Sequence, residues 1–335
     1  MREKHLRTSA TSADKTAARL LDFSIVIPTF NTAAMTLACC RAAIAAMPAE
    51  SEVIVVDDGS TDGTCEVLRA EVPEVQIVRL DRNQRFAAAA NAGVAVANGA
   101  IILLLNSDTR IDREAPAKLL AAFADDAKLG VAGAQLIDSD GTPQWSGGPQ
   151  PTLLWMVVMV SGIAHALPRR KRTRGGDVGW VSGAAMAFRR EAWIDAGPLN
   201  ETYHFYAQDL ELCVRARANG WHVRVIEDAK VVHDGGATLR RARHVAELPH
   251  DPSLLWLDLL AWGRAHYGRA WAWSARALMF AAASLRILGR TLRELLLRGE
   301  ARRSSRSTTR VYAAALRQLF VEREQSPGQG LGREA

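Results

Sequence analysis

The 335-residue sequence has few cysteines and no hydrophobic run long enough to span a membrane. Its four cysteines, Cys39, Cys40, Cys65 and Cys213, show neither paired spacing nor a CxxC motif. This excludes a disulfide framework and favours reduced thiols in a cytosolic protein. The strongly apolar segment 152–167 has sixteen residues, fewer than the ~20 that a spanning helix needs. We expect it to form buried core, with a membrane-interface element as the alternative.

The first residues, MREKHLRTSATSADKTAARLLD, lack the apolar centre and small-residue cleavage site of a secretory signal. We expect a flexible N-terminal tail over residues 1–22 and a flexible C-terminal tail over residues 324–335. No internal repeat is evident in the sequence between them.

Charge is distributed unevenly along the chain, whose formal net charge is +6. Residues 1–236 carry 25 Lys and Arg against 28 Asp and Glu, a net of −3, whereas residues 237–323 carry 16 Arg against 6 acids, a net of +10. A basic and apolar-rich segment suits anionic lipid or nucleic acid. The Trp and Leu content of this segment favours lipid.

The segment 23–236 alternates between strand-like and helix-like sequence. Short β-branched or aliphatic runs that close in polar loops occupy residues 23–31, 51–64, 75–80 and 100–105. Helical composition lies between them, at residues 32–47 and 86–98. Such alternation predicts βαβ units and a parallel sheet, hence an α/β fold.

Polar side chains end three of the predicted strands. They are Thr29, Asp57, Asp58, Asn106, Ser107 and Asp108. Each cluster alone is compatible with an ordinary turn. Because the carboxyl ends of parallel strands share one sheet edge, where open α/β sheets bind ligands, the three together favour a binding site.

Seven motifs carry a family resemblance. In order they are SIVIPTFN, VIVVDDGSTDGT, NQRFAAAANAG, LLLNSDT, VSGAAMAFRREAW, YAQDLELCVRARANGW and VVHDGG, spanning residues 23–236. This series resembles inverting family-two glycosyltransferases of the GT-A fold, and especially their bacterial rhamnosyltransferase-like members. The resemblance implies a Rossmann-like, mostly parallel sheet flanked by helices, and a nucleotide-sugar donor.

The resemblance also implies a donor site. Its predicted residues are Thr29, Asp57, Asp58, Asn83, Asn91, Ser107, Trp180 and Gly183. A carboxylate suits the base and ribose because it accepts hydrogen bonds from N–H groups and hydroxyls. The chain departs from the pattern at Arg85, where the family usually has Gly. Arg85 is interpreted either as a phosphate contact or as a surface charge.

The family's metal-binding Asp-x-Asp signature matches Asn106 and Asp108, with Asn in place of the first acid. His233 matches a position that serves some members as a further ligand. Mg²⁺ or Mn²⁺ is the implied cofactor, since hard cations take oxygen ligands and substrate phosphate. A His at a strand end is otherwise a surface or capping residue.

Inverting transfer needs a general base for the acceptor hydroxyl. The family's Glu-Asp pair matches Gln208 and Asp209, which makes Asp209 the implied catalytic residue. The alternative for Asp209 is an acid at a helix N-terminus, stabilised by the helix dipole; the two roles are compatible.

Residues 237–323 are expected to form a basic amphipathic helical extension. In segment 271–299, Leu285, Leu288, Leu292 and Leu295 share one helix face. We expect this helix to lie in a membrane interface rather than to pack on the α/β domain, and the protein to be peripheral at the inner, cytoplasmic face of the plasma membrane.

The resemblance implies an inverting, metal-dependent hexosyltransferase that acts in cell-envelope polysaccharide synthesis, and the basic, apolar C-terminal region favours a polyprenyl-linked glycan over a free glycan as its acceptor. A degenerate domain that binds nucleotide sugar or membrane without catalysis is the alternative. A nucleotidyltransferase is disfavoured, because PTFNTAAMT is not a Gly-rich basic loop. Nucleic acid is not an expected partner.

Overall fold

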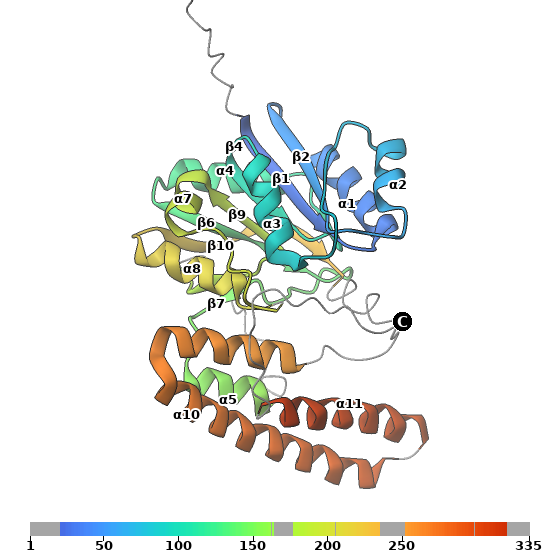
Figure 1. The fold of residues 1–335 in the computed structure, drawn as a ribbon, viewed down its shortest axis with the longest axis vertical. Helices are drawn as coiled ribbons and strands as arrows, with labels where there is room; N and C mark the ends of the chain where they lie inside the picture. Colours follow the sequence, from blue (N-terminus) through green and yellow to red (C-terminus); the bar gives the residue numbers. More distant parts are fainter. Residues whose placement is uncertain are drawn as a thin grey trace, which may run out of the picture.

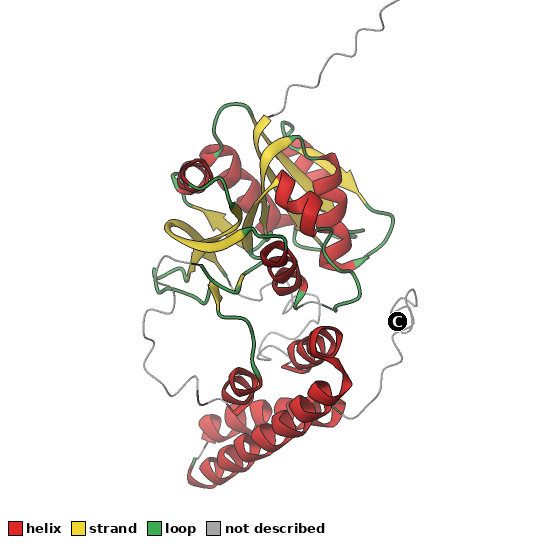
Figure 2. Ribbon diagram, turned by 90° about the vertical axis from the view of Figure 1, so that its left-hand side faces the viewer, coloured by secondary structure: helices red, strands yellow, loops and turns green. Residues whose placement is uncertain are grey.

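The molecule combines an α/β sheet domain with a separate layer of helices below it in Figures 1 and 2. The computed structural model describes residues 21–161, 163, 177–204, 206–234, 252–297 and 299–319. The two predicted tails lie outside the described residues, apart from Leu21 and Asp22, which begin the first strand.

The eight-stranded sheet runs in the order β3-β2-β1-β4-β9-β6-β10-β5. Its strands are β1 (Leu21–Thr29), β2 (Ser51–Asp57), β3 (Gln76–Arg79), β4 (Gly99–Leu105), β5 (Thr109–Ile111), β6 (Leu129–Ile137), β9 (Ala185–Arg189) and β10 (His222–His233). Strands β1 to β4 pair in parallel, as does β6 with β10, whereas β9 and β5 pair antiparallel to their neighbours. A second, two-stranded sheet joins β7 (Gly147–Gly148) to β8 (Trp180–Val181).

Helices cover both faces of the large sheet. They are α1 (Ala33–Ala46), α2 (Thr64–Glu71), α3 (Arg85–Val96), α4 (Ala115–Asp125), α7 (Arg190–Ala196) and α8 (Gln208–Ala218). One buried cluster packs α1 and α4 against one face, and another packs α3 and α8 against the other. The aliphatic run Ile101–Leu105 of β4 is buried on both faces. The predicted α/β class with a mostly parallel sheet is therefore confirmed.

The helical layer contains α5 (Leu153–Ser161), α10 (Pro252–Leu296) and α11 (Gly299–Gln318), which lie together in Figure 1. The sequence predicted one helix over 271–299, but α10 begins nineteen residues earlier, at Pro252, and doubles back at Gly268. Gly268 has φ +83°, a conformation that glycine adopts without strain. Gly263 lets the two arms touch, because a Cβ there would lie 1.7 Å from the Trp271 ring.

The apolar segment predicted as core is divided between burial and exposure. Met156 and Val160 of α5 are buried against α10, whereas Leu154 is exposed. On α10, the leucines predicted to share one face, Leu285, Leu288, Leu292 and Leu295, are 55% to 69% exposed. They therefore do not pack on the α/β domain. No described helix is long and apolar enough to span a membrane.

The two layers meet in one continuous apolar core. Tyr203 and Ala207, just before α8, and Leu210, in its first turn, pack in the same buried cluster as α5, α10 and α11. Polar contacts reinforce this junction. Asp258 of α10 is fully buried and accepts hydrogen bonds from the backbone N–H groups of His204 (2.9 Å) and Tyr206 (2.8 Å).

Candidate active site

A cavity of about 720 Å³ lies where the sheet edge meets the helical layer. The ends of β1, β2, β4 and β10, the loop before β9 and the start of α8 all contribute to its lining. The predicted residues that it brings together are Thr29, Asp58, Asn83, Asn106, Ser107, Asp108, Gly183, Asp209 and His233. This convergence follows from the parallel strands, which deliver their carboxyl ends to one edge.

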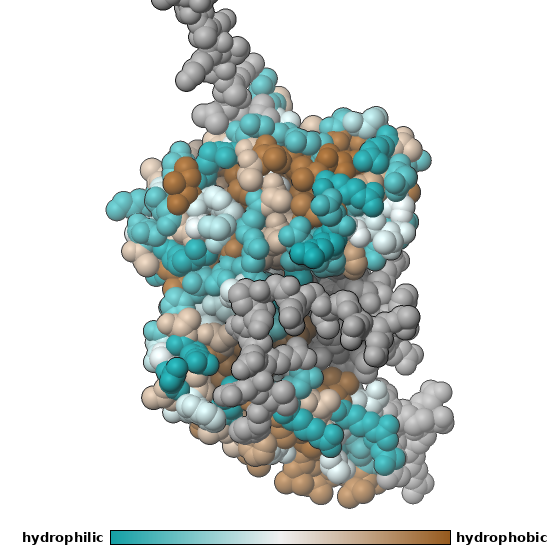
Figure 3. Space-filling view, in the orientation of Figure 1, coloured by the Kyte–Doolittle hydropathy of each residue, from teal (hydrophilic) through white to brown (hydrophobic). Residues whose placement is uncertain are grey.

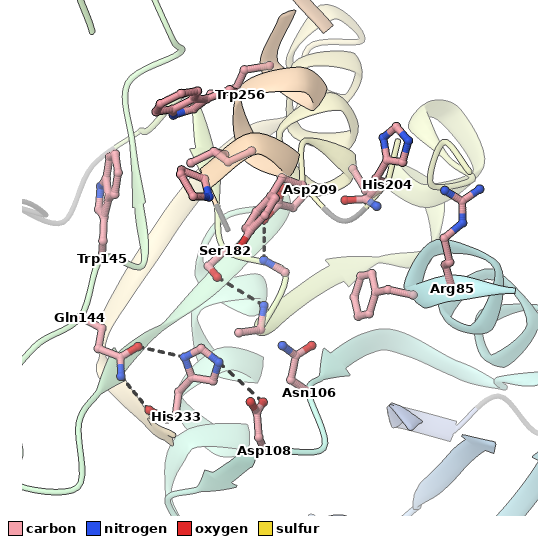
Figure 4. A pocket seen from close by; sticks show the side chains of 18 of the residues that line it. Arg85, Asn106, Asp108, Gln144, Trp145, Ser182, His204, Asp209, His233 and Trp256 are labelled. Atoms are coloured by element: carbon pink, nitrogen blue, oxygen red, sulfur yellow. Dashed lines mark hydrogen bonds and ion pairs between the residues drawn. The ribbon is translucent and has the colours of Figure 1, made fainter. Parts of the chain in front are cut away.

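Asp108 and His233 face each other at one end of the cavity (Figure 4). His233 Nε2 lies 3.6 Å from Asp108 Oδ1, too far for a hydrogen bond. Asp108 Oδ1 is buried and has no hydrogen-bond partner among the described residues. The other ring nitrogen, His233 Nδ1, lies 2.9 Å from Gln144 Oε1, so that an Nδ1–H donor leaves the Nε2 lone pair directed at Asp108.

This arrangement fits a divalent cation. A buried carboxylate oxygen without a donor, facing an imidazole nitrogen, is what a shared ion would satisfy. Asn106 lies beside the pair (Figure 4), and its side-chain amide contains an oxygen of the kind that hard cations take as ligands. Within the described ranges no three His, Cys, Asp or Glu residues cluster as a metal site. Asn106, Asp108 and His233 are thus the residues that would hold the ion, together with substrate oxygens.

Asp209 lies at the middle of the cavity, at the N-terminus of α8. Its Oδ2 accepts a hydrogen bond from the Gly183 N–H (2.9 Å) and its Oδ1 accepts one from the Leu210 N–H (2.8 Å). Burial raises the pKa of the Asp209 carboxyl, and these two N–H groups partly oppose that rise. The carboxylate is therefore fixed in orientation and more basic than an ordinary Asp.

Asp58 connects the end of β2 to the start of α3. Its two carboxylate oxygens accept hydrogen bonds from the backbone N–H groups of Gln84 (2.7 Å) and Arg85 (2.9 Å). Burial nevertheless raises the pKa of Asp58 to about 6. Arg85 has φ +77°, the left-handed region that glycine prefers, which accounts physically for a glycine at this position in the family pattern. Its exposed side chain lines the cavity mouth.

Three predicted donor residues lie outside the cavity lining. Asp57 is buried and accepts hydrogen bonds from the Ser60 N–H and the Cys65 thiol. Asn91 bonds Leu199 and ties α3 to the segment before α8. Both side chains thus hold chain segments together.

Trp180, the third, stacks edge-on against Trp145, with ring centroids 5.2 Å apart. It therefore supports a wall of the cavity from behind, because Trp145 does line the cavity.

Sequence reasoning missed several lining residues. Gln144 and Trp145 come from the loop after β6, and His204 and Tyr206 precede α8. Others come from the helical layer, among them Trp155, Trp256, Met279, Arg286 and Tyr312. No local sequence signal distinguishes the residues of the helical layer, because the packing of this layer on the sheet domain brings them to the cavity.

Comparison with known proteins supports the motif-based resemblance. The chain is 32% identical over 222 residues to the succinoglycan biosynthesis protein ExoU of Rhizobium meliloti, covering 63% of this chain and 61% of ExoU. It is 27% identical to the N-acetylglucosaminyl-diphospho-decaprenol L-rhamnosyltransferase of Mycobacterium tuberculosis, covering 58% of this chain and 70% of that enzyme. The chain thus spans about three-fifths of the length of ExoU.

A solved structure, GalNAc-T7 with UDP, GalNAc and Mn²⁺, has a TM-score of 0.49 and 18% identity, covering 64% of this chain and 44% of that one. That similarity is too low to decide any feature of the site. The sequence profile of Glycosyl transferase family 2 matches residues 24–196, which is more than half of the chain. The chain therefore belongs to glycosyl transferase family 2.

Proposed function

We propose that this family 2 glycosyltransferase transfers a sugar, with inversion, from a nucleotide-diphosphate donor to a hydroxyl of a glycan or lipid-linked glycan. The observation that carries the proposal is Asp209, a desolvated carboxylate held by the Gly183 N–H and facing the same cavity as the Asp108–His233 pair. A base and an anion-neutralising centre on one cavity are what displacement of a nucleoside diphosphate requires.

Asp209 accepts the proton of the acceptor hydroxyl while the oxygen of that hydroxyl attacks the anomeric carbon. The bond between that carbon and the diphosphate oxygen breaks, and the nucleoside diphosphate leaves with its electron pair. Asp58 and Asn83 line the side of the cavity assigned to the nucleotide. When a divalent cation is bound by Asn106, Asp108 and His233, it supplies positive charge for the leaving diphosphate.

The proposal places the protein at the inner face of the plasma membrane as a peripheral protein. Support comes from α10, whose second arm exposes Leu285, Leu288, Leu292 and Leu295. Figure 3 shows apolar side chains gathered at the lower end of the molecule, over the helical layer. The net charge of +10 over residues 237–323 attracts anionic headgroups to this layer.

A donor panel tests the proposal. Purified protein is incubated with UDP-, dTDP- and GDP-sugars, with Mg²⁺ or Mn²⁺, in the presence and absence of bacterial membrane extract. Release of nucleoside diphosphate is measured. Rhamnose is the first sugar to test, because one relative is a rhamnosyltransferase. Release that depends on both metal and extract is expected. Donor binding without turnover of any sugar would instead indicate a non-catalytic binding domain.

A further inference from the structure

The cavity extends well beyond the groups needed for a nucleotide sugar. Figure 4 shows Trp256 on the opposite side of Asp209 from the Asp108–His233 pair, and Trp145 to the left of Asp209. We call the part formed by the helical layer the apolar lobe: Trp155 and Met159 of α5, Trp256, Leu259 and Met279 of α10, and Tyr312 of α11. A water-soluble donor has no use for a lobe of this composition, whereas an apolar chain is stabilised in it.

Arg286 is a cation placed in these apolar surroundings. Its side chain is half-buried and lines the cavity, with the guanidinium carbon 3.9 Å from the Tyr312 ring centroid. Nη1 donates a hydrogen bond to the Val160 carbonyl (3.2 Å). In the part of the chain that the structure describes, Arg286 forms no ion pair with a carboxylate. A guanidinium has five N–H donors, so several remain for the oxygens of an anion.

The same helix connects the lobe to the exposed apolar face. Met279, Ala283 and Arg286 follow one another at helical spacing toward the interior, and the first two are fully buried. Leu285 and Leu288 lie on the outer face and are 69% and 56% exposed. Helix α10 thus carries exposed leucines on its outer face and the cavity-lining side chains of Met279 and Arg286 on its inner face.

We propose that the apolar lobe binds the lipid end of the acceptor, an isoprenoid diphosphate, and that Arg286 binds its diphosphate. This inference rests on the proposed glycosyl transfer and names the class of acceptor. A single bound ligand then uses each part of the cavity. Its isoprenoid units contact the apolar lobe, and its diphosphate receives charge-assisted hydrogen bonds from Arg286. Its acceptor sugar lies next to Asp209.

The test measures binding of radiolabelled farnesyl diphosphate to the full-length protein by equilibrium dialysis, without any nucleotide sugar. We expect Arg286→Gln to raise the dissociation constant about tenfold or more, the factor expected from losing a charge-assisted hydrogen bond. The matched control is Arg293→Gln, which removes an exposed charge from the same helix outside the cavity; it leaves the constant unchanged. Equal binding by the wild type and Arg286→Gln overturns the proposal.

A second variant tests the lobe without changing charge. Met159→Trp adds volume on α5 where its side chain lines the cavity, so farnesyl diphosphate binding weakens about tenfold or more while binding of inorganic pyrophosphate stays as in the wild type. Unchanged farnesyl diphosphate binding in this variant contradicts a lipid in the lobe. Circular dichroism of Arg286→Gln, Arg293→Gln and Met159→Trp checks that each variant is folded.

A bilayer headgroup is the other source of a lipid phosphate. Co-sedimentation with phosphatidylglycerol vesicles distinguishes it: the proposal predicts equal vesicle binding by Arg286→Gln and Arg293→Gln. A loss specific to Arg286→Gln, with farnesyl diphosphate binding intact, assigns the cation to the membrane and overturns the proposal. Since dialysis contains no donor, its result is independent of the donor panel, and failure of either leaves the other interpretable.

Discussion

The sheet domain and the helical layer differ in how they contribute to one cavity. The sheet domain supplies polar groups from strand ends and loops: Asp209 and His233 are held by hydrogen bonds, and Asp108 is buried. The helical layer supplies mainly apolar and aromatic side chains, and its outer face is leucine-rich and basic. In the proposed function, donor chemistry belongs to the first region, and acceptor and membrane contacts belong to the second.

The largest expected effect is that of a substitution at Asp209 of the sheet domain. We expect Asp209→Asn to lower the transfer rate by about 10³-fold, within the range that general-base catalysis contributes, while the dissociation constant of the donor changes little. Single-turnover rates and isothermal titration with the donor separate the two effects. Glu211→Gln is the control on the same helix, because its carboxylate contacts His266 instead of lining the cavity. Full activity in Asp209→Asn would remove it from the role.

Asp258 tests whether the two regions depend on each other. Removing its buried carboxylate leaves the N–H groups of His204 and Tyr206 without their acceptor, so Asp258→Ala should lower the free energy of unfolding by about 3 kcal/mol. Urea denaturation measures this change. The control Glu71→Ala removes an exposed carboxylate paired with Arg41 and should cost about 0.5 kcal/mol. Similar losses in both variants would show that the junction is not held by Asp258.

Gln144 tests how the sheet domain orients a proposed metal ligand. It holds His233 through the Nδ1 contact, and its loss frees the ring to rotate away from Asp108. We expect Gln144→Ala to raise the Mn²⁺ concentration for half-maximal activity by about 10-fold, at the low end of effects from groups that orient metal ligands. Gln150→Ala, whose side chain bonds Tyr267 outside the cavity, should leave it unchanged. An unaltered Mn²⁺ requirement in Gln144→Ala contradicts the assignment.

The outer face of α10 tests the proposed membrane contact of the helical layer. Leu288→Glu should weaken binding to phosphatidylglycerol vesicles about tenfold, since one leucine contributes about 1.5 kcal/mol or more on leaving water. The control is Ile194→Glu, which places the same charge at an exposed apolar position of the sheet domain; co-sedimentation should not change. Equal losses in both variants would indicate a non-specific charge effect.

The pH dependence gives the smallest expected effect. Asp209 acts as a base only when ionised, and burial raises its pKa above the ordinary value of 3.8. The rate should therefore rise with pH through that raised pKa and be lost below it. A profile of kcat/KM against pH measures the position of this acid limb. A profile that stays flat down to pH ~4, the ordinary range for Asp, would show that no perturbed carboxylate limits the rate.

Much of the sheet domain was predictable because its signals are local. The aliphatic run before Asn106 predicts a buried strand, and that strand is β4, with Asp108 just beyond it. The second predicted strand segment, 51–64, contains β2, and the predicted helix at 86–98 overlaps α3. The structure places the side chains of Asn91 and Asp57, two of the predicted donor residues, in contacts that join chain segments. A polar side chain near a site has the same sequence signal in either role.

The sequence alone determined the α/β alternation, the family motifs and the polar strand ends. Hydrophobic periodicity and the polar residues at strand ends depend only on residues that are close together in the sequence. Only the tertiary structure decided which of those polar groups meet, that Gln144 orients His233, and that Arg286 lines the same cavity as Asp209. The physical reason is distance along the chain. Gln144 and His233 lie 89 residues apart in the sheet domain, and Arg286 reaches the cavity only because α10 packs under the start of α8. Packing between segments so far apart leaves no periodic signal in either one.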